Sequence, residues 1–242
     1  MLLLLDELEA DNAPATSLYV PDDLPMPELE KALKAPLGHS LEEVISDITD
    51  ALARSITGAV IFWGTENRYL VLPPFSIKAK LFSSGYDVEP LRSMLQQNLL
   101  LGLILVRLGA YAVGVFQGDK LVSSKIGTGL VHSRHKKGGS SARRFERHRE
   151  KQIEYFFERV CGHVREHLEP HLQQIDYVIY GGERHTLLSF RKQCQFLQKF
   201  DDRTISSLMN VREPKKATLE AAISQAWSSE VIQWQETEPK MS

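Results

Sequence analysis

The residue types best suited to chemistry lie in one segment, between positions 129 and 151. A basic loop leads there to the pair Gly138-Gly139, and Ser140 and Ser141 follow as caps of a predicted helix. A glycine pair adopts backbone conformations that other residues avoid, and the free N–H groups at a helix start attract anions such as phosphate. These residues predict phosphate binding next to an accessible stretch of backbone.

The same segment concentrates the positive charge of the protein. Residues 131–151 hold eight Lys and Arg against two Glu, whereas the 242-residue chain has 29 basic and 31 acidic residues and a formal net charge of −2. The residues expected to contact RNA are Arg134, His135, Lys136, Lys137, Arg143, Arg144, Arg147 and Lys151. Arg143, Arg147 and Lys151 stand four residues apart, so on a helix they form one basic ridge. The alternative is a solvated basic helix with a flexible loop.

The start of the chain carries the opposite charge. Residues 1–30 hold eight Asp and Glu and no Lys or Arg, and five prolines interrupt the stretch between positions 14 and 36. We therefore expect residues 1–39 to form an acidic extension that is weakly structured or packed at the periphery. This extension is expected to shield the basic segment from non-specific RNA.

Composition excludes several classes of protein. With 43% hydrophobic and 25% charged residues, the chain is typical of a globular protein. The apolar start, Met1–Leu5, is too short for a signal peptide, and the longest strongly apolar stretch, Leu99–Val106, is far shorter than the roughly 20 residues of a membrane helix. Only Cys161 and Cys194 are present, so we expect no disulfide framework and no CxxC metal knuckle, and a reducing cytoplasm is the simplest compartment.

A metal site is not expected either. His163, His167 and His171 recur every four residues, which would align them on one face of a helix. Pro170, however, breaks the helix before the third histidine, and no cysteine or well-placed carboxylate completes a ligand set.

The order of predicted elements indicates a mixed α/β fold. A capping box at Ser40 opens a helix that Gly58 ends. The elements expected next are a hairpin over 59–72, a helix over 89–98, an antiparallel meander of strands over 100–107, 111–116 and 120–126, and a long helix from position 140 or 141 to Pro170. The chain is expected to end with a strand over 175–180, a helix over 186–199, a strand over 206–211 and a helix over 215–232. We predict one α/β domain over 40–233 and a tail over 234–242.

The run from Gly138 to Arg147, placed after a strand and opening a long helix, resembles the GGQ loop and helix of archaeal and eukaryotic class-1 peptide release factors. Over roughly residues 58–233, the predicted elements follow the order of that family's middle domain. The chain is most similar to the Vms-like actinobacteria and chloroflexi branch, kin to the eukaryotic peptidyl-tRNA hydrolase of ribosome quality control. No room is expected before Gly58 for a codon-reading domain or after Ile232 for a GTPase-binding domain, so codon-independent action is expected.

The resemblance implies that the loop enters the peptidyl-transferase centre and meets large-subunit ribosomal RNA and the CCA end of P-site peptidyl-tRNA. In the family, the glutamine after Gly-Gly positions the water that attacks the ester, and its N–H stabilises the transition state. Here Ser140 stands in place of that glutamine. The expected catalytic residues are therefore Gly138 and Gly139, which shape the loop, Ser140, which supplies the N–H and a water contact, and Ser141.

Two functions follow from the resemblance. The first is a ribosome-associated release or rescue factor that hydrolyses the peptidyl-tRNA ester without a cofactor. The second is a non-catalytic ribosome- or tRNA-binding rescue or quality-control factor that occupies the same site, since serine reaches less far than glutamine. A third possibility is that the basic segment binds another RNA, or only the acidic start of the chain. No membrane or DNA partner is expected.

Overall fold

The computed structural model describes residues 1–38, 41–132 and 142–234, which divide into two compact units. The first unit contains residues 1–97 together with the segment from Trp227, and the second contains residues 98–226. The boundaries predicted from the sequence, at 39/40 and 233/234, differ from this division. No helix among the described residues is long and apolar enough to cross a membrane.

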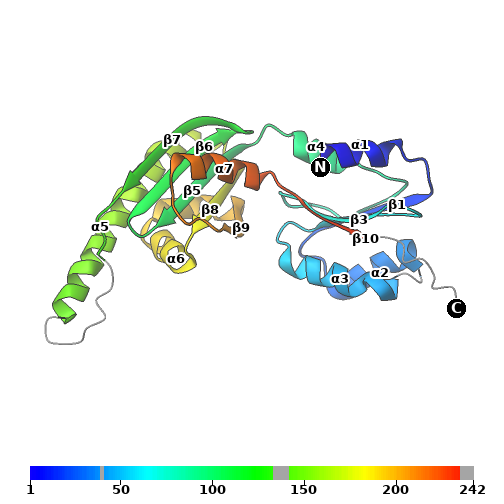
Figure 1. Ribbon diagram of the computed structural model, residues 1–242, viewed down its shortest axis with the longest axis horizontal. Helices are drawn as coiled ribbons and strands as arrows, with labels where there is room; N and C mark the ends of the chain where they lie inside the picture. Colours follow the sequence, from blue (N-terminus) through cyan, green and yellow to red (C-terminus); the bar gives the residue numbers. More distant parts are fainter. Residues whose placement is uncertain (39–40, 133–141, 235–242) are drawn as a thin grey trace. The chain divides into compact units, whose positions relative to one another are not determined.

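The first unit is built on a five-stranded antiparallel sheet. Its strands, in spatial order, are β10 (Glu230–Trp234), β3 (Arg68–Leu72), β2 (Ala59–Gly64), β1 (Ala15–Val20) and β4 (Leu81–Ser84). The helices α1 (Leu2–Ala10) and α4 (Glu89–Gln96) cover one face, and α2 (Met26–Leu37) and α3 (Leu41–Arg54) cover the other (Figure 1). The hairpin predicted over 59–72 and the helix predicted over 89–98 are confirmed.

The first 39 residues are part of this unit and not a peripheral extension. Strand β1 pairs with β2 on one side and with β4 on the other. Its side chains alternate between two cores, because Leu18 packs with the α2/α3 layer and Tyr19 with the α1/α4 layer. The prolines that suggest a loose segment flank the strand at Pro14 and Pro21, so they delimit it without interrupting it.

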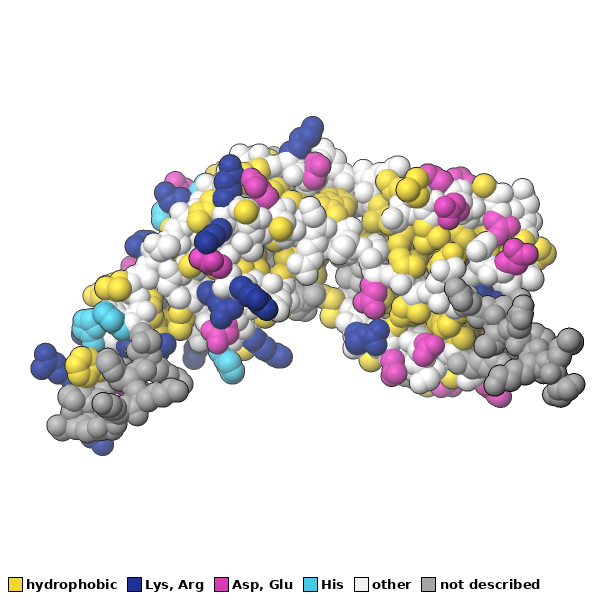
Figure 2. Space-filling view, viewed as in Figure 1, with side chains coloured by type: hydrophobic (Ala, Val, Ile, Leu, Met, Phe, Trp, Pro, Cys, Tyr) yellow, Lys and Arg dark blue, Asp and Glu magenta, His cyan; other side chains and the backbone are white. Residues whose placement is uncertain are grey.

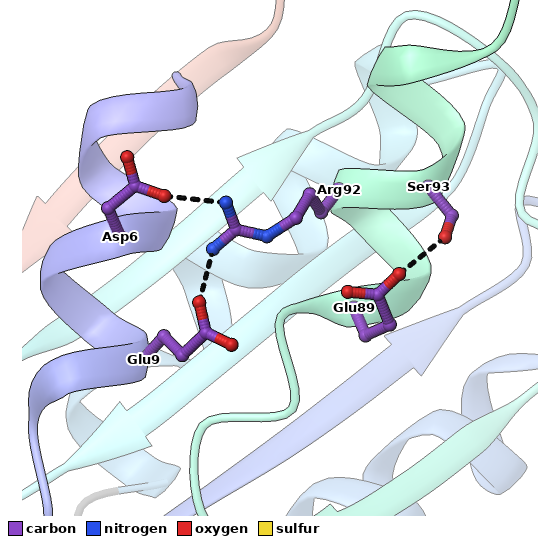
Figure 3. A network of polar contacts seen from close by, with 5 residues as sticks. All are labelled: Asp6, Glu9, Glu89, Arg92 and Ser93. Carbon is purple, nitrogen blue, oxygen red and sulfur yellow. Dashed lines mark hydrogen bonds and ion pairs between the residues drawn. The ribbon is translucent and has the colours of Figure 1, made fainter.

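One arginine ties α1 to α4. Arg92 donates to Asp6 Oδ1 at 2.5 Å and to Glu9 Oε2 at 2.7 Å, so its guanidinium bridges two carboxylates of α1 (Figure 3). The hydrogen bond to Asp6 raises the pKa of Arg92 against the opposing effect of desolvation. On the side facing the sheet, Leu5 and Leu8 of α1 are buried. Two acids of the predicted acidic extension therefore hold a cation within their own unit.

The second unit is built on a mixed sheet, as the sequence predicts. Its strands, in spatial order, are β7 (Lys120–Thr128), β6 (Ala110–Gln117), β5 (Leu100–Arg107), β8 (Tyr177–Gly182) and β9 (Thr204–Met209). The strands β5, β6 and β7 form the predicted antiparallel meander, and β8 and β9 add to it in parallel. The helices are α5 (Ala142–Leu168), α6 (Arg184–Gln193) and α7 (Lys216–Ala226), with 3-10 turns over Glu169–His171 and Gln195–Arg203.

Helices cover both faces of this sheet. On one face, a Cβ atom at Gly102 would lie 3.2 Å from Leu168 of α5, and on the other a Cβ atom at Gly114 would lie 2.8 Å from Leu219 of α7. The helix α6 shares the core of α5, since the rings of Phe157 and Phe190 stand 5.6 Å apart. Burial on both faces explains why β5 is apolar from Leu100 to Val106 instead of alternating with polar residues.

Two helices predicted near the end of the chain are shorter than expected. The helix predicted over 186–199 is α6 up to Gln193 and continues as 3-10 turns. The helix predicted over 215–232 ends at Ala226, and residues 230–234 form β10, which pairs with β3 of the first unit. The partner strand lies far back in the sequence, so local periodicity does not reveal this pairing.

The helix α5 divides into a packed half and an exposed half. In its second half, Phe156, Val160, Val164 and Leu168 recur at helical spacing and are buried against the sheet. Residues 143–148 are all exposed, and the start of the helix extends past the sheet (Figure 1). The packed half fixes the direction of the helix, and the exposed half presents its side chains to solvent.

The two cysteines of the chain form a disulfide, which the sequence does not predict. Cys161 of α5 and Cys194, directly after α6, have Cα atoms 5.5 Å apart and are joined across 33 residues of sequence. Cys194 is fully buried in the core that α5 and α6 share. Two cysteines so far apart in sequence indicate no pairing by themselves, because only the packing of the two helices brings them together.

We expect reduction of this disulfide to destabilise the second unit. Closing a loop of this length stabilises a fold by roughly 3 to 4 kcal/mol, chiefly through the unfolded state. Urea unfolding with and without a dithiol reductant measures the difference, and Cys161→Ser/Cys194→Ser, which removes the crosslink, should make the two curves coincide. Alkylation of both cysteines in the folded, unreduced protein would contradict the crosslink.

Candidate nucleic-acid interface

The predicted site falls partly outside the described residues. Gly138, Gly139, Ser140 and Ser141, expected to act in catalysis, lie there together with Arg134, His135, Lys136 and Lys137. The other four predicted RNA contacts are described, and all are exposed on α5: Arg143, Arg144, Arg147 and Lys151. Because these four side chains are exposed, their cationic groups are accessible to a large anionic partner.

The charge of the whole chain is divided between the two units. The second unit has 21 Lys and Arg against 13 Asp and Glu, whereas the first has 8 against 18. Figure 2 shows Lys and Arg side chains gathered on the second unit and acidic side chains prevailing on the visible face of the first. The near-zero net charge therefore conceals one unit that attracts a polyanion and one that repels it.

The chain leading from β7 toward the undescribed segment is fixed to α5. Gly129 N–H donates to Gly109 O at 2.9 Å, and the Arg159 guanidinium donates to Thr128 O. A Cβ atom at Gly129 would lie 2.6 Å from the Phe156 ring, so the close approach of this backbone to α5 requires glycine. The meander and the helix are thereby held together directly before the basic segment.

His132, the last described residue before the gap, is also bound to α5. Its N–H donates to Gln152 Oε1 at 3.2 Å, its Nδ1 lies 2.9 Å from the same oxygen, and its carbonyl accepts from Arg149 Nε at 2.9 Å. Since Gln152 Oε1 only accepts, Nδ1 carries the proton. Sequence reasoning missed Arg149, Gln152 and Arg159, because nothing in their type or spacing distinguishes them from solvated helix residues.

Two of the three spaced histidines contact neighbouring side chains of the second unit. His163 Nδ1 lies 3.1 Å from Glu166 Oε2, and its ring stacks on Tyr111 with centroids 5.6 Å apart. His167 Nδ1 lies 3.0 Å from Ser123 Oγ of β7. The hydrogen bond from His163 lowers the pKa of Glu166, and burial lowers the pKa of His167. In the part of the chain that the structure describes, no group of three or more His, Cys, Asp or Glu side chains could hold a metal ion.

A comparison with models of protein families identifies the family of this chain. Residues 100–232, more than half of the chain, match the family model of the actinobacteria/chloroflexi VLRF1 release factor. The chain belongs to this family. The matched range of the VLRF1 release factor contains every predicted site residue, and it lies within the range over which the sequence resembles class-1 release factors.

Curated relatives of this VLRF1 family member include archaeal release factors. The peptide chain release factor subunit 1 of Archaeoglobus fulgidus is 25% identical over 214 residues, which are 77% of this chain and 53% of the relative. That of Saccharolobus solfataricus is 24% identical over 251 residues, 92% of this chain and 68% of the relative. A crystal structure of the archaeal translation termination factor aRF1 covers 93% of this chain and 71% of its own, with 19% identity and a TM-score of 0.40. The chain spans about half the length of most of the curated relatives it matches.

We expect the exposed ridge of α5 to set the salt dependence of RNA binding. Replacing Arg143, Arg147 and Lys151 by Gln should lower the slope of log affinity against log salt by about 2 for single-stranded RNA, since each phosphate contact contributes about 0.7. Titration of a labelled oligonucleotide at several salt concentrations measures this slope. The matched control neutralises Lys120, Lys192 and Lys216, which are exposed elsewhere on the second unit. An equal loss of slope in the control would contradict a localised interface.

Proposed function

We propose that this protein is a ribosome-associated, codon-independent release or rescue factor that hydrolyses the peptidyl-tRNA ester. The observation that carries the proposal is the VLRF1 release-factor family match over residues 100–232, in which the Gly138-Gly139 pair is followed by the exposed basic half of α5. Ribosomal RNA of the large subunit and the CCA end of P-site tRNA are the proposed partners. The cytoplasm is the proposed compartment because the proposed partner is the ribosome; the Cys161–Cys194 disulfide removes the argument from reduced cysteines.

The proposed reaction is an addition of water to an ester. Water attacks the carbonyl carbon, the bond to the ribose oxygen of tRNA breaks, and that oxygen takes up a proton, so the products are a peptide acid and free tRNA. The backbone N–H of Ser140 would stabilise the negative charge that develops on the carbonyl oxygen, a role that needs no particular side chain. The Ser140 hydroxyl would contact the water, and Gly138 and Gly139 would let the backbone approach closely.

The proposal of codon-independent action is supported by the charge of the first unit, and not by a small number of residues before Gly58. The expectation of too little chain for a second domain before Gly58 is not supported, because residues 1–97 contribute to a compact unit of their own. That unit has 8 basic against 18 acidic residues, so messenger-RNA phosphates would be repelled from it. Its charge therefore favours action without codon reading.

The alternative function is a non-catalytic factor that binds the same ribosomal site. The observation that favours it is the serine at position 140, where class-1 release factors carry glutamine. A serine side chain is shorter by two heavy-atom positions, so it orders a water molecule less effectively.

We expect Gly139→Ala to lower the rate of peptide release by about 10²- to 10³-fold, because a methyl group there would keep the Ser140 N–H from the ester, and losing one transition-state donor usually costs this much. The measurement is release of labelled peptide from purified ribosomal complexes, accompanied by binding to large subunits. Binding should stay unchanged, because the substitution removes no charge. If the wild type releases no more peptide than Gly139→Ala although both bind, the non-catalytic function holds. If neither binds large subunits, both functions are wrong.

We also expect Ser140→Gln to raise the rate of release, because the longer amide reaches a water that serine contacts poorly. The same assay measures the change, and Ser224→Gln, on an exposed position of α7, is the matched control. A rate unchanged or lowered by Ser140→Gln would show that the water contact does not limit the reaction.

A further inference from the structure

The chain meets α5 at two different heights along the helix, once before and once after residues 133–141. After these residues, α5 begins at Ala142. Before them, His132 is hydrogen-bonded to Arg149 and Gln152 of α5. These residues stand seven and ten positions into the helix, so the two levels are about 10 to 15 Å apart along the axis at 1.5 Å per residue. Any displacement of His132 thus moves the point from which residues 133–141 start.

The attachment holds the backbone as well as the side chain of His132. Gln152 Oε1 accepts from the backbone N–H at 3.2 Å and from Nδ1 at 2.9 Å, and Arg149 Nε donates to the carbonyl at 2.9 Å. Both polar groups of one peptide residue are therefore fixed by two side chains of the same helix. A contact through the imidazole alone would leave the backbone dihedral angles of His132 unrestrained.

One ring contact accompanies these hydrogen bonds, because the centroid of the His132 ring lies 6.2 Å from that of His148 of α5. Val131 packs against the core of the second unit, but His132 is exposed. Arg149 lines a cavity of about 700 Å³ between α5 and α6, together with Ile153 and Phe157 of α5. A ring contact involves only the imidazole, whereas the hydrogen bonds to Arg149 and Gln152 hold the carbonyl and the N–H of the His132 backbone.

We propose that Arg149 and Gln152 are positioning residues, which clasp His132 to α5 and thereby set how the Gly138-Gly139 segment is presented to the ester. This inference rests on the proposed function. It also separates Arg149 from its neighbours Arg147 and Lys151, because those side chains face solvent and are expected to bind RNA phosphates, whereas the Nε of Arg149 is committed to the chain itself.

The variant Gln152→Met tests the clasp, since it removes the acceptor and keeps the length of the side chain without changing charge. Hydrogen exchange of the His132 amide should become about 5-fold faster, as expected for the loss of one hydrogen bond. The rate of peptide release at saturating protein should fall roughly 10-fold, because misplacement of the reacting groups by less than 1 Å already has this effect. The protein concentration for half-maximal release should stay the same.

Two further variants complete the test. Gln152→Glu keeps an acceptor for both donors of His132 and should restore amide protection and release rate. Gln193→Met is the matched control, because Gln193 Nε2 donates to Glu154 O of α5 at 3.0 Å but lies outside the clasp. It removes one glutamine-to-α5 hydrogen bond and should leave the release rate unchanged.

Each contrary outcome has its own meaning. Unchanged protection of the His132 amide in Gln152→Met would show that the clasp does not exist. Lost protection with an unchanged release rate, or without rescue by Gln152→Glu, would overturn the positioning role. A shift in the concentration for half-maximal release, with the rate preserved, would overturn it too and make Gln152 an RNA contact. Absence of release by the wild type would instead overturn the proposed function itself.

Discussion

The packing of α5 on the sheet of the second unit is the constraint on which the rest of the site depends. Phe156, Val160, Val164 and Leu168 bury one stripe of the helix, and the disulfide from Cys161 joins the same half to the end of α6. A helix anchored along only part of its length can extend its other part into solvent without losing direction, because its backbone hydrogen bonds are internal. The exposed arginines are therefore displayed on a rigid support.

Charge separation between the units complements this arrangement. Arg92 bridges Asp6 and Glu9 within the first unit, so some of the acidic residues stabilise that unit locally. The excess of acids that remains gives the first unit a negative charge, which would disfavour RNA there and favour the second unit as the site of the proposed RNA contacts. If the same charged residues were spread evenly over both units, a polyanionic partner would have no electrostatic preference for either unit.

Local patterns in the sequence are sufficient to predict most helices and strands of the second unit. The meander follows from three apolar runs separated by glycine turns, and the long helix from the spacing of residues such as Phe156 and Val160. The sequence did not predict the strands β1 and β10. Prolines flank β1, and β10 pairs with a strand that is distant in sequence. The ridge of α5 was predictable from a four-residue repeat, but the bonds from His132 to Arg149 and Gln152 join residues 17 and 20 positions apart, which no helical or strand period connects.

Contacts at several levels tie the chain before residues 133–141 to the helix that follows them. The close contact of Gly129 with Phe156 and the hydrogen bonds of His132 hold the chain before these residues, and α5 begins after them at Ala142. The conformational entropy that binding would otherwise cost is thereby reduced in the free protein, since the residues next to the loop are already ordered. With a serine at position 140 in place of a longer amide, the proposed hydrolysis depends more heavily on such preorganisation of the backbone than on the reach of a side chain.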